Sequence, residues 1–135
     1  MSLIRAIRVA AILVSLVSGC IPTTTASLEI GSGYAVNDMA DAEAIVENLQ
    51  FSRIWFDAPS NLRVPRVERE GRLIAAFEQR QFGVSVELQP SDGLLRLTFA
   101  ERNTEFSEKG QQVLHRLTEQ LRIRFGPQVR LTSSA

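Results

Sequence analysis

The stretch from Val84 to Phe99 constrains the fold more than any other part of the chain. Apolar residues occupy every second position on both sides of Pro90-Ser91-Asp92-Gly93, a sequence typical of a turn. Because successive side chains of a strand point to opposite faces, this pattern predicts a β-hairpin with one apolar and one polar face. The apolar face consists of Val84, Val86, Leu88, Leu95, Leu97 and Phe99. Another element must cover it.

A helix with a matching apolar stripe follows this hairpin. Ser107 is a suitable N-cap, Glu108 suits the positive end of the helix dipole, and Gly126-Pro127 ends the helix. We expect a last short strand over residues 128–132. The stripe that should cover the hairpin consists of Val113, Leu114, Leu117 and Leu121.

Residues 65–82 allow two interpretations. Pro65 at the start, Gly83 at the end and the helix-forming residues 75–80 favour a helix, which is the preferred interpretation. In the alternative, Glu70-Gly71 is the turn of a second hairpin. Both interpretations stay open at this point.

The preceding part of the domain predicts a helix over residues 38–50 and a strand over residues 52–57. Asn37 or Asp38 would cap the helix, and its apolar residues recur at helical spacing. The strand is rich in aromatic residues and stops at a turn over residues 58–61. We expect its Trp55 to pack under a helix. The apolar helix positions are Met39, Ala42, Ile45, Val46 and Leu49.

The predicted order of elements is helix, strand, helix, strand, strand, helix, strand. Its last six members are those of a ferredoxin-like βαββαβ sandwich, so the expected fold class is a small two-layer α+β sandwich with an extra N-terminal helix. That extra helix would cover part of the other sheet face, toward Phe51 and Trp55. If residues 65–82 form a hairpin, an antiparallel β-meander flanked by the first and last helices is the alternative.

The N-terminus reads as a secretory signal. Arg5 and Arg8 precede an apolar run over residues 9–17, which ends in the small residues Ser18 and Gly19. The run is shorter than the roughly 20 apolar residues needed to span a bilayer. We therefore expect residues 1–19 to be a signal peptide and not a permanent anchor.

The sequence Val17-Ser18-Gly19-Cys20 resembles the lipobox of bacterial lipoproteins. The resemblance implies attachment of diacylglycerol to Cys20, cleavage after Gly19 and acylation of the new amino terminus. Anchoring by two or more acyl chains is stable where a single chain is marginal. Ile21, and not Asp, follows the cysteine, which by analogy with lipoprotein sorting favours the outer membrane.

Residues 20–33 are rich in Thr, Ser and Gly and are expected to form a lipidated flexible tether. A single α+β domain over residues 34–132 would follow, with residues 133–135 as a tail. The domain should face the periplasm, while exposure at the cell surface stays open. Cys20 is the only cysteine, so no disulfide is expected.

Charge argues against a nucleic-acid partner. The chain carries 15 basic and 15 acidic residues, and loss of Arg5 and Arg8 with the signal leaves a net charge of about −2. Removal of residues 1–19 leaves 116 residues, enough for one domain with a modest core.

No motif predicts catalysis, a cofactor or a metal site. His115 is the only histidine and is expected on the surface, with no second histidine or cysteine to complete a metal site. The acidic pairs Glu68/Glu70 and Glu101/Glu105 lie next to arginines and are expected to form surface salt bridges.

Four arginines at a spacing of three are the one charge feature with a functional interpretation. Arg63, Arg66, Arg69 and Arg72 would lie along one helix and could reach lipid headgroups or glycan phosphates. The simpler expectation is a solvated face neutralised by Glu68 and Glu70. The preferred function is a non-enzymatic, lipid-anchored accessory or interaction module of an envelope complex, with an unidentified protein partner. The alternative is a lipid- or glycan-binding module.

Overall fold

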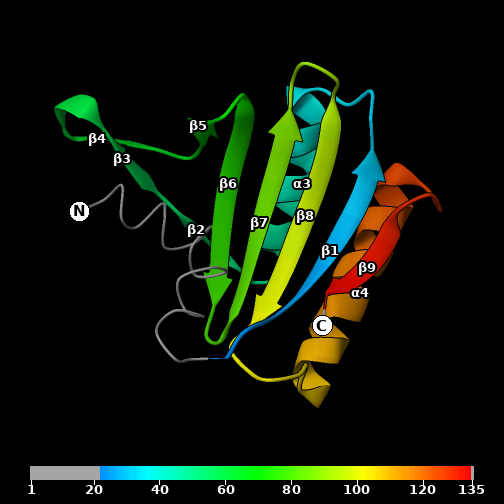
Figure 1. Cartoon of the computed structure of the whole chain (residues 1–135). Helices are drawn as coiled ribbons and strands as arrows, with labels where there is room; N and C mark the ends of the chain where they lie inside the picture. Colours follow the sequence, from blue (N-terminus) through cyan, green and yellow to red (C-terminus); the bar gives the residue numbers. More distant parts are fainter. Residues whose placement is uncertain (1–21, 135) are drawn as a thin grey trace.

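The computed structural model describes residues 22–134, and most of these residues belong to one antiparallel sheet (Figure 1). Within this part of the chain the sheet has seven strands in the order β2-β6-β7-β8-β1-β9, with β5 beside β6 on the same side as β2. The strands are β1 (Thr24–Gly31), β2 (Ser52–Ile54), β5 (Val67–Arg69), β6 (Arg72–Gln79), β7 (Phe82–Gln89), β8 (Leu94–Glu101) and β9 (Arg130–Ser134). A small separate hairpin consists of β3 (Phe56–Ala58), the 3₁₀ turn η1 (Pro59–Asn61) and β4 (Leu62–Val64).

Two helices, α3 (Val36–Asn48) and α4 (Glu108–Phe125), lie on the same face of this sheet (Figure 1). Between residues 22 and 134, neither helix combines the length and apolar character needed to cross a bilayer. The predicted positions of these two helices are correct within about two residues at each end, the usual uncertainty of helix boundaries.

The core lies between the helices and the sheet. The predicted hairpin is present as β7 and β8, with Val86 paired to Leu97 in the antiparallel register. Its apolar face and the stripe of α4 belong to one buried cluster, as predicted. The helix α3 contributes Met39, Ala42 and Val46 to the same cluster.

Residues 65–82 are not a helix, so the preferred interpretation is wrong. Strands β5 and β6 pair across a two-residue turn at Glu70-Gly71, and Arg69 lies opposite Arg72. Both turn residues have positive φ, 50° and 75°, the conformation that suits such turns to the twist of a hairpin. Pairing of β6 with β7 from Leu73 to Gln79 outweighs the helical preference of residues 75–80.

The ferredoxin-like sandwich is wrong for the same reason, because the helix that it requires between the first two strands does not form. The flanked meander is also wrong as a whole fold. The strand order departs from the chain order where β1 lies between β8 and β9, and the two helices share one face. The result is a strand-rich antiparallel fold.

The expected tether over residues 20–33 is wrong over most of its length. Residues 24–31 form β1, which pairs with β8 on one side and with β9 on the other. Its residues Ala26, Leu28 and Ile30 are buried in the core. The folded domain therefore begins near Thr24 and not at residue 34. The predicted signal peptide, residues 1–19, and the lipidation site Cys20 lie outside the described residues.

Candidate functional site

Residues 55–66 form an arm that leaves the sheet after β2 and returns at β5. Ile54 pairs with Ala76 and Val67 pairs with Ile74, so the two ends of the arm are neighbours along β6. Figure 1 shows the arm extending beyond β6, toward the end of the sheet that carries the β7–β8 turn. The arm contains the β3–β4 hairpin, in which Phe56 lies opposite Val64.

The base of the arm has its own small apolar cluster. Phe56 and Ala76 are buried in it, and Ile54, Val64 and Val67 pack around them. Ala76 belongs to β6, so the cluster joins the arm to the sheet. The arm is therefore a packed element with a defined position.

Two large apolar side chains of the arm are exposed to solvent. Trp55, between β2 and β3, is 44% exposed, and Leu62, opposite Ala58 at the end of the hairpin, is 61% exposed. The prediction that Trp55 packs under a helix is wrong, because the strand expected over residues 52–57 breaks at this residue and both helices lie elsewhere. Phe51, which was expected to accompany it, is buried in the main core.

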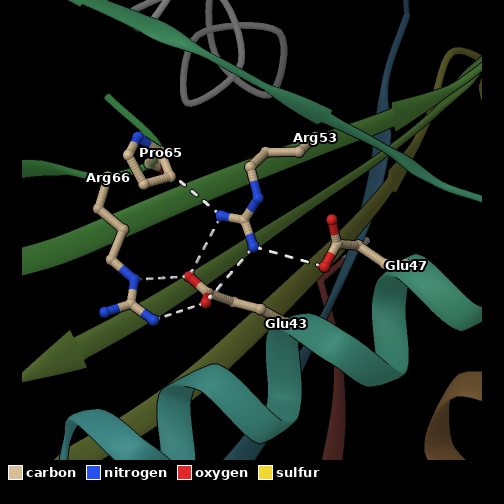
Figure 2. A network of polar contacts seen from close by, with 5 residues as sticks. All are labelled: Glu43, Glu47, Arg53, Pro65 and Arg66. Carbon is tan, nitrogen blue, oxygen red and sulfur yellow. Dashed lines mark hydrogen bonds and ion pairs between the residues drawn. The ribbon is translucent and has the colours of Figure 1, made fainter. Parts of the chain in front are cut away.

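A buried carboxylate on α3 holds the base of the arm (Figure 2). Glu43 is 3% exposed, and its two oxygens accept hydrogen bonds of 2.6 and 2.8 Å from Nη2 and Nε of Arg66. Arg66 lies between β4 and β5, where the arm rejoins the sheet. A bidentate arginine–carboxylate pair is among the strongest polar contacts in proteins and fixes the orientation of both partners.

Arg53 adds a second cation to this network. It lies opposite Phe77 in the β2–β6 pairing, and its guanidinium stands 4.8 Å from the centre of the Phe77 ring. It approaches Glu43 and Glu47 at 3.5 Å each and donates a longer hydrogen bond of 3.4 Å to the carbonyl of Pro65. Figure 2 shows the two guanidinium groups converging on Glu43 from different segments.

The charges of this network are mutually compensated. A buried carboxylate without a partner is costly, and two guanidinium groups meet that requirement here. The hydrogen bonds that Arg66 donates to Glu43 raise the pKa of Arg66 above its ordinary value, which favours its charged form. The network therefore fastens α3, β2 and the returning end of the arm to one another.

The four arginines at a spacing of three do not form one basic face. Arg66 is engaged with Glu43, while Arg72 pairs with Glu87 at 3.1 Å and with Glu70 at 3.5 Å. Arg63 lies on the arm, 3.9 Å from Asp57. Because residues 65–82 are strands and turns, a spacing of three does not place these side chains on one side.

The other candidate residues lie apart from the arm. His115 is 71% exposed on α4 and lies 3.2 Å from Glu119, in agreement with the predicted surface position. Glu68, Glu70 and Glu105 are exposed, but Glu101 is buried, contrary to the expected surface salt bridge. Within residues 22–134 no group of three potential ligands is placed to hold a metal ion.

A surface depression of about 410 Å³ lies on α4. It is lined by Lys109, Gln112, Val113, His115 and Arg116, of which four are polar. It opens on the solvent side of a single helix and is not the enclosed apolar cavity that a lipid-binding module would need.

Glu43 and Arg53 were not recognised as a pair from the sequence. In the sequence, Glu43 is one of several acidic residues near the N-terminal end of the helix predicted over residues 38–50. Its position was nevertheless informative, since it follows Met39 by four residues and precedes Val46 by three, and so lies within the apolar stripe of α3. An acid at such a position requires a basic partner from elsewhere in the fold.

No protein-family model matches this chain, and a sequence search of curated proteins finds no match.

Proposed function

We propose that this protein is a lipid-anchored, non-enzymatic contact module of the bacterial envelope, held in the outer membrane through Cys20 with its domain in the periplasm. The anchor rests on the basic residues Arg5 and Arg8, the apolar run behind them and Val17-Ser18-Gly19-Cys20. The domain acts by binding a protein partner.

The observation that carries the proposal is the pair of exposed side chains Trp55 and Leu62 on the arm. Tryptophan is enriched among the residues that dominate binding energy at protein interfaces. Such residues contribute most when the surface is already ordered, because little conformational entropy is then lost on binding. The Glu43–Arg66 contact and the cluster around Phe56 supply that order.

A protein partner suits these features better than a lipid or glycan ligand. Of the four arginines proposed for phosphate contacts, Arg66 and Arg72 are already engaged with carboxylates. The exposed part of the arm instead presents Trp55 and Leu62 beside polar side chains such as Asp57 and Arg63, a mixture of apolar and polar groups that is found at protein contacts.

Site-specific photo-crosslinking in cells tests the contact surface. A benzophenone amino acid replaces Leu62 in the full-length chain, and the same group replacing His115 on α4 is the control. We expect a discrete crosslinked product from position 62 and none from position 115. Trp55→Ala should lower its yield about tenfold if this tryptophan dominates the binding energy. An adduct of equal yield from both positions, or one indifferent to Trp55→Ala, would contradict the proposal.

Mass spectrometry of the mature protein tests the anchor. We expect diacylglycerol on Cys20 as the first residue, and complete loss of acylation and membrane retention in Cys20→Ser. Equal membrane retention of the Cys20→Ser variant would contradict the lipid anchor.

A further inference from the structure

We infer that the end of the sheet where β1 begins is seated directly on the bilayer surface, so that the arm is presented away from the membrane. This end, called the anchor-proximal end below, consists of the start of β1, the β6–β7 turn (residues 80–81) and the loop from β8 to α4 (residues 102–107). The inference rests on the proposed acylation of Cys20.

The connection between Cys20 and the sheet is short. Only residues 21–23 separate Cys20 from Thr24, the first residue of β1. The four Cα–Cα steps from Cys20 to Thr24 span at most about 14 Å even in a fully extended chain. The sheet therefore begins within that distance of the residue that carries the acyl chains, and the domain cannot stand clear of the headgroups as it could on a longer tether.

Thr24 itself is firmly attached to the sheet. It lies opposite Glu101 of β8, and its hydroxyl donates a hydrogen bond of 2.8 Å to the carbonyl of Asn103. The backbone N–H of Arg102 donates to the carbonyl of Gln81, which joins the two loops of this end. These bonds fix the start of β1 relative to the other loops of the anchor-proximal end, so a tether attached at residue 23 holds this whole end near the membrane.

The surface at this end has charges of both signs. They belong to the exposed side chains of this end, together with those beside it at the end of β6 and in the first turn of α4. Such a surface suits a layer of headgroups that contains both phosphates and amines. The basic residues are Arg80, Arg102 and Lys109, and the acidic residues are Glu78, Glu105 and Glu108. Because these charges balance, the short connection and not electrostatic attraction determines the orientation. The seating should persist on uncharged bilayers and at high salt.

The opposite end of the sheet carries the β7–β8 turn. The strands β7 and β8 have eight residues each and so extend roughly 26 Å from the anchor-proximal end to the turn at Pro90–Gly93. Figure 1 shows the arm reaching toward the same end as that turn, opposite to the point where β1 begins. The domain thus holds Trp55 and Leu62 away from the lipid.

Fluorescence quenching in vesicles tests this orientation. Trp55 is the only tryptophan, so Trp55→Phe provides a silent background for single reporters. The acylated mature protein, which begins at Cys20, is reconstituted into dibrominated phosphatidylcholine vesicles. It carries Thr104→Trp at the anchor-proximal end, or Ser91→Trp at the opposite turn as the matched control. A tryptophan at headgroup level should lose emission in brominated lipid relative to the same protein in unbrominated lipid. We expect that result for position 104 and no quenching for position 91, unchanged in about 0.5 M salt.

A second experiment lengthens the connection between Cys20 and β1. About ten Gly and Ser residues inserted after Ile21 add a reach of roughly 17 Å and should abolish the quenching at position 104. Equal quenching at both positions, or none at position 104 in protein whose Cys20 is acylated by mass spectrometry, would overturn the orientation alone. Failure to find acyl groups on Cys20 would overturn the proposed anchor and the orientation with it.

Discussion

The carboxylate of Glu101 lies directly against the α-carbon of Gly110, in the first turn of α4. Glu101 is 1% exposed and accepts a hydrogen bond of 2.9 Å from the backbone N–H of Ser107, the N-cap of the helix. The Ser107 hydroxyl in turn accepts from the N–H of Gly110 at 3.0 Å. A buried carboxyl group is thus placed at the N-terminal end of α4, where it accepts a hydrogen bond from one of the free backbone N–H groups of the helix start.

Gly110→Ala should destabilise the protein although alanine is the better helix former. A Cβ at this position would collide with Oε1 of Glu101 and lie 3.3 Å from the ring of Phe82. Overpacking of this kind costs typically about 1 to 3 kcal/mol, measurable as a lower free energy of unfolding in urea. Gln112→Ala, at an exposed position of the same helix, is the control and should change little. A stabilised Gly110→Ala variant would show that Glu101 can move aside freely.

Glu43→Gln should lower the free energy of unfolding by about 3 kcal/mol or more, because it leaves two partly buried guanidinium groups without their carboxylate. Glu47→Gln removes a carboxylate that is 45% exposed and 3.5 Å from Arg53, and should cost less than about 1 kcal/mol. Urea denaturation of both variants compares them. Equal losses would mean that burial of Glu43 adds nothing to the network.

The contact between α3 and α4 should respond to acid. The backbone N–H of Ala35 and the guanidinium of Arg124 hold the pKa of Asp38 below its ordinary value of 3.8. The folded state therefore binds a proton at Asp38 less readily than the unfolded state does. The resulting stabilisation is fully present above that ordinary value and is lost as the pH falls through the lowered one.

Asp38→Asn should accordingly make the urea midpoint less dependent on pH between about pH 5 and pH 2 than it is in the wild type. The effect should be small, since Arg124 is 41% exposed and solvent weakens the pair. Arg124→Gln should weaken the same pH dependence. A wild-type slope in both variants would argue against this contact in solution.

Leu117→Ala should lower the melting temperature strongly. Leu117 is fully buried in the core shared by α4, β7 and β8, and such truncations cost about 2 to 5 kcal/mol. For a domain of this size that corresponds to a loss of about 10 °C or more in Tm. His115→Ala, two residues earlier on the exposed side of α4, should leave Tm nearly unchanged. Equal losses of Tm in the two variants would mean that the face of α4 described as packing against the sheet is the wrong one.

The best-predicted parts of the fold are those whose patterns have one physical interpretation. The hairpin β7–β8 alternates because one of its faces lies in the apolar core, whereas the other carries partly exposed polar residues such as Glu87 and Arg96. The helix α4 has both a cap at Ser107 and a continuous apolar stripe. In contrast, Ile74 and Ala76 on one face of β6 and Ala75 and Phe77 on the other are all buried. A strand covered on both faces loses its alternation and resembles a buried helix segment.

β1 was missed for a different reason. Ala26, Leu28 and Ile30 do alternate with polar residues, but Thr, Ser and Gly around them are equally typical of a linker. Only the two neighbouring strands distinguish these possibilities. The arm and the Glu43 network also depend on contacts between distant parts of the chain, which a local sequence pattern does not reveal. Glu43 and Arg66 are 23 positions apart and form a hydrogen bond only in the folded structure.

The place of β1 between β8 and β9 has a consequence for how the chain reaches its native state. Ser27 accepts a hydrogen bond from Thr132, which lies 105 positions later. A sheet whose first strand pairs with its last two cannot close until nearly the whole chain is available. Such distant pairings slow folding, because loop entropy is lost before the contacts form. A chain threaded through a membrane pore with its N-terminus leading would thus stay unfolded in transit, and the sheet would close only after the final residues emerge.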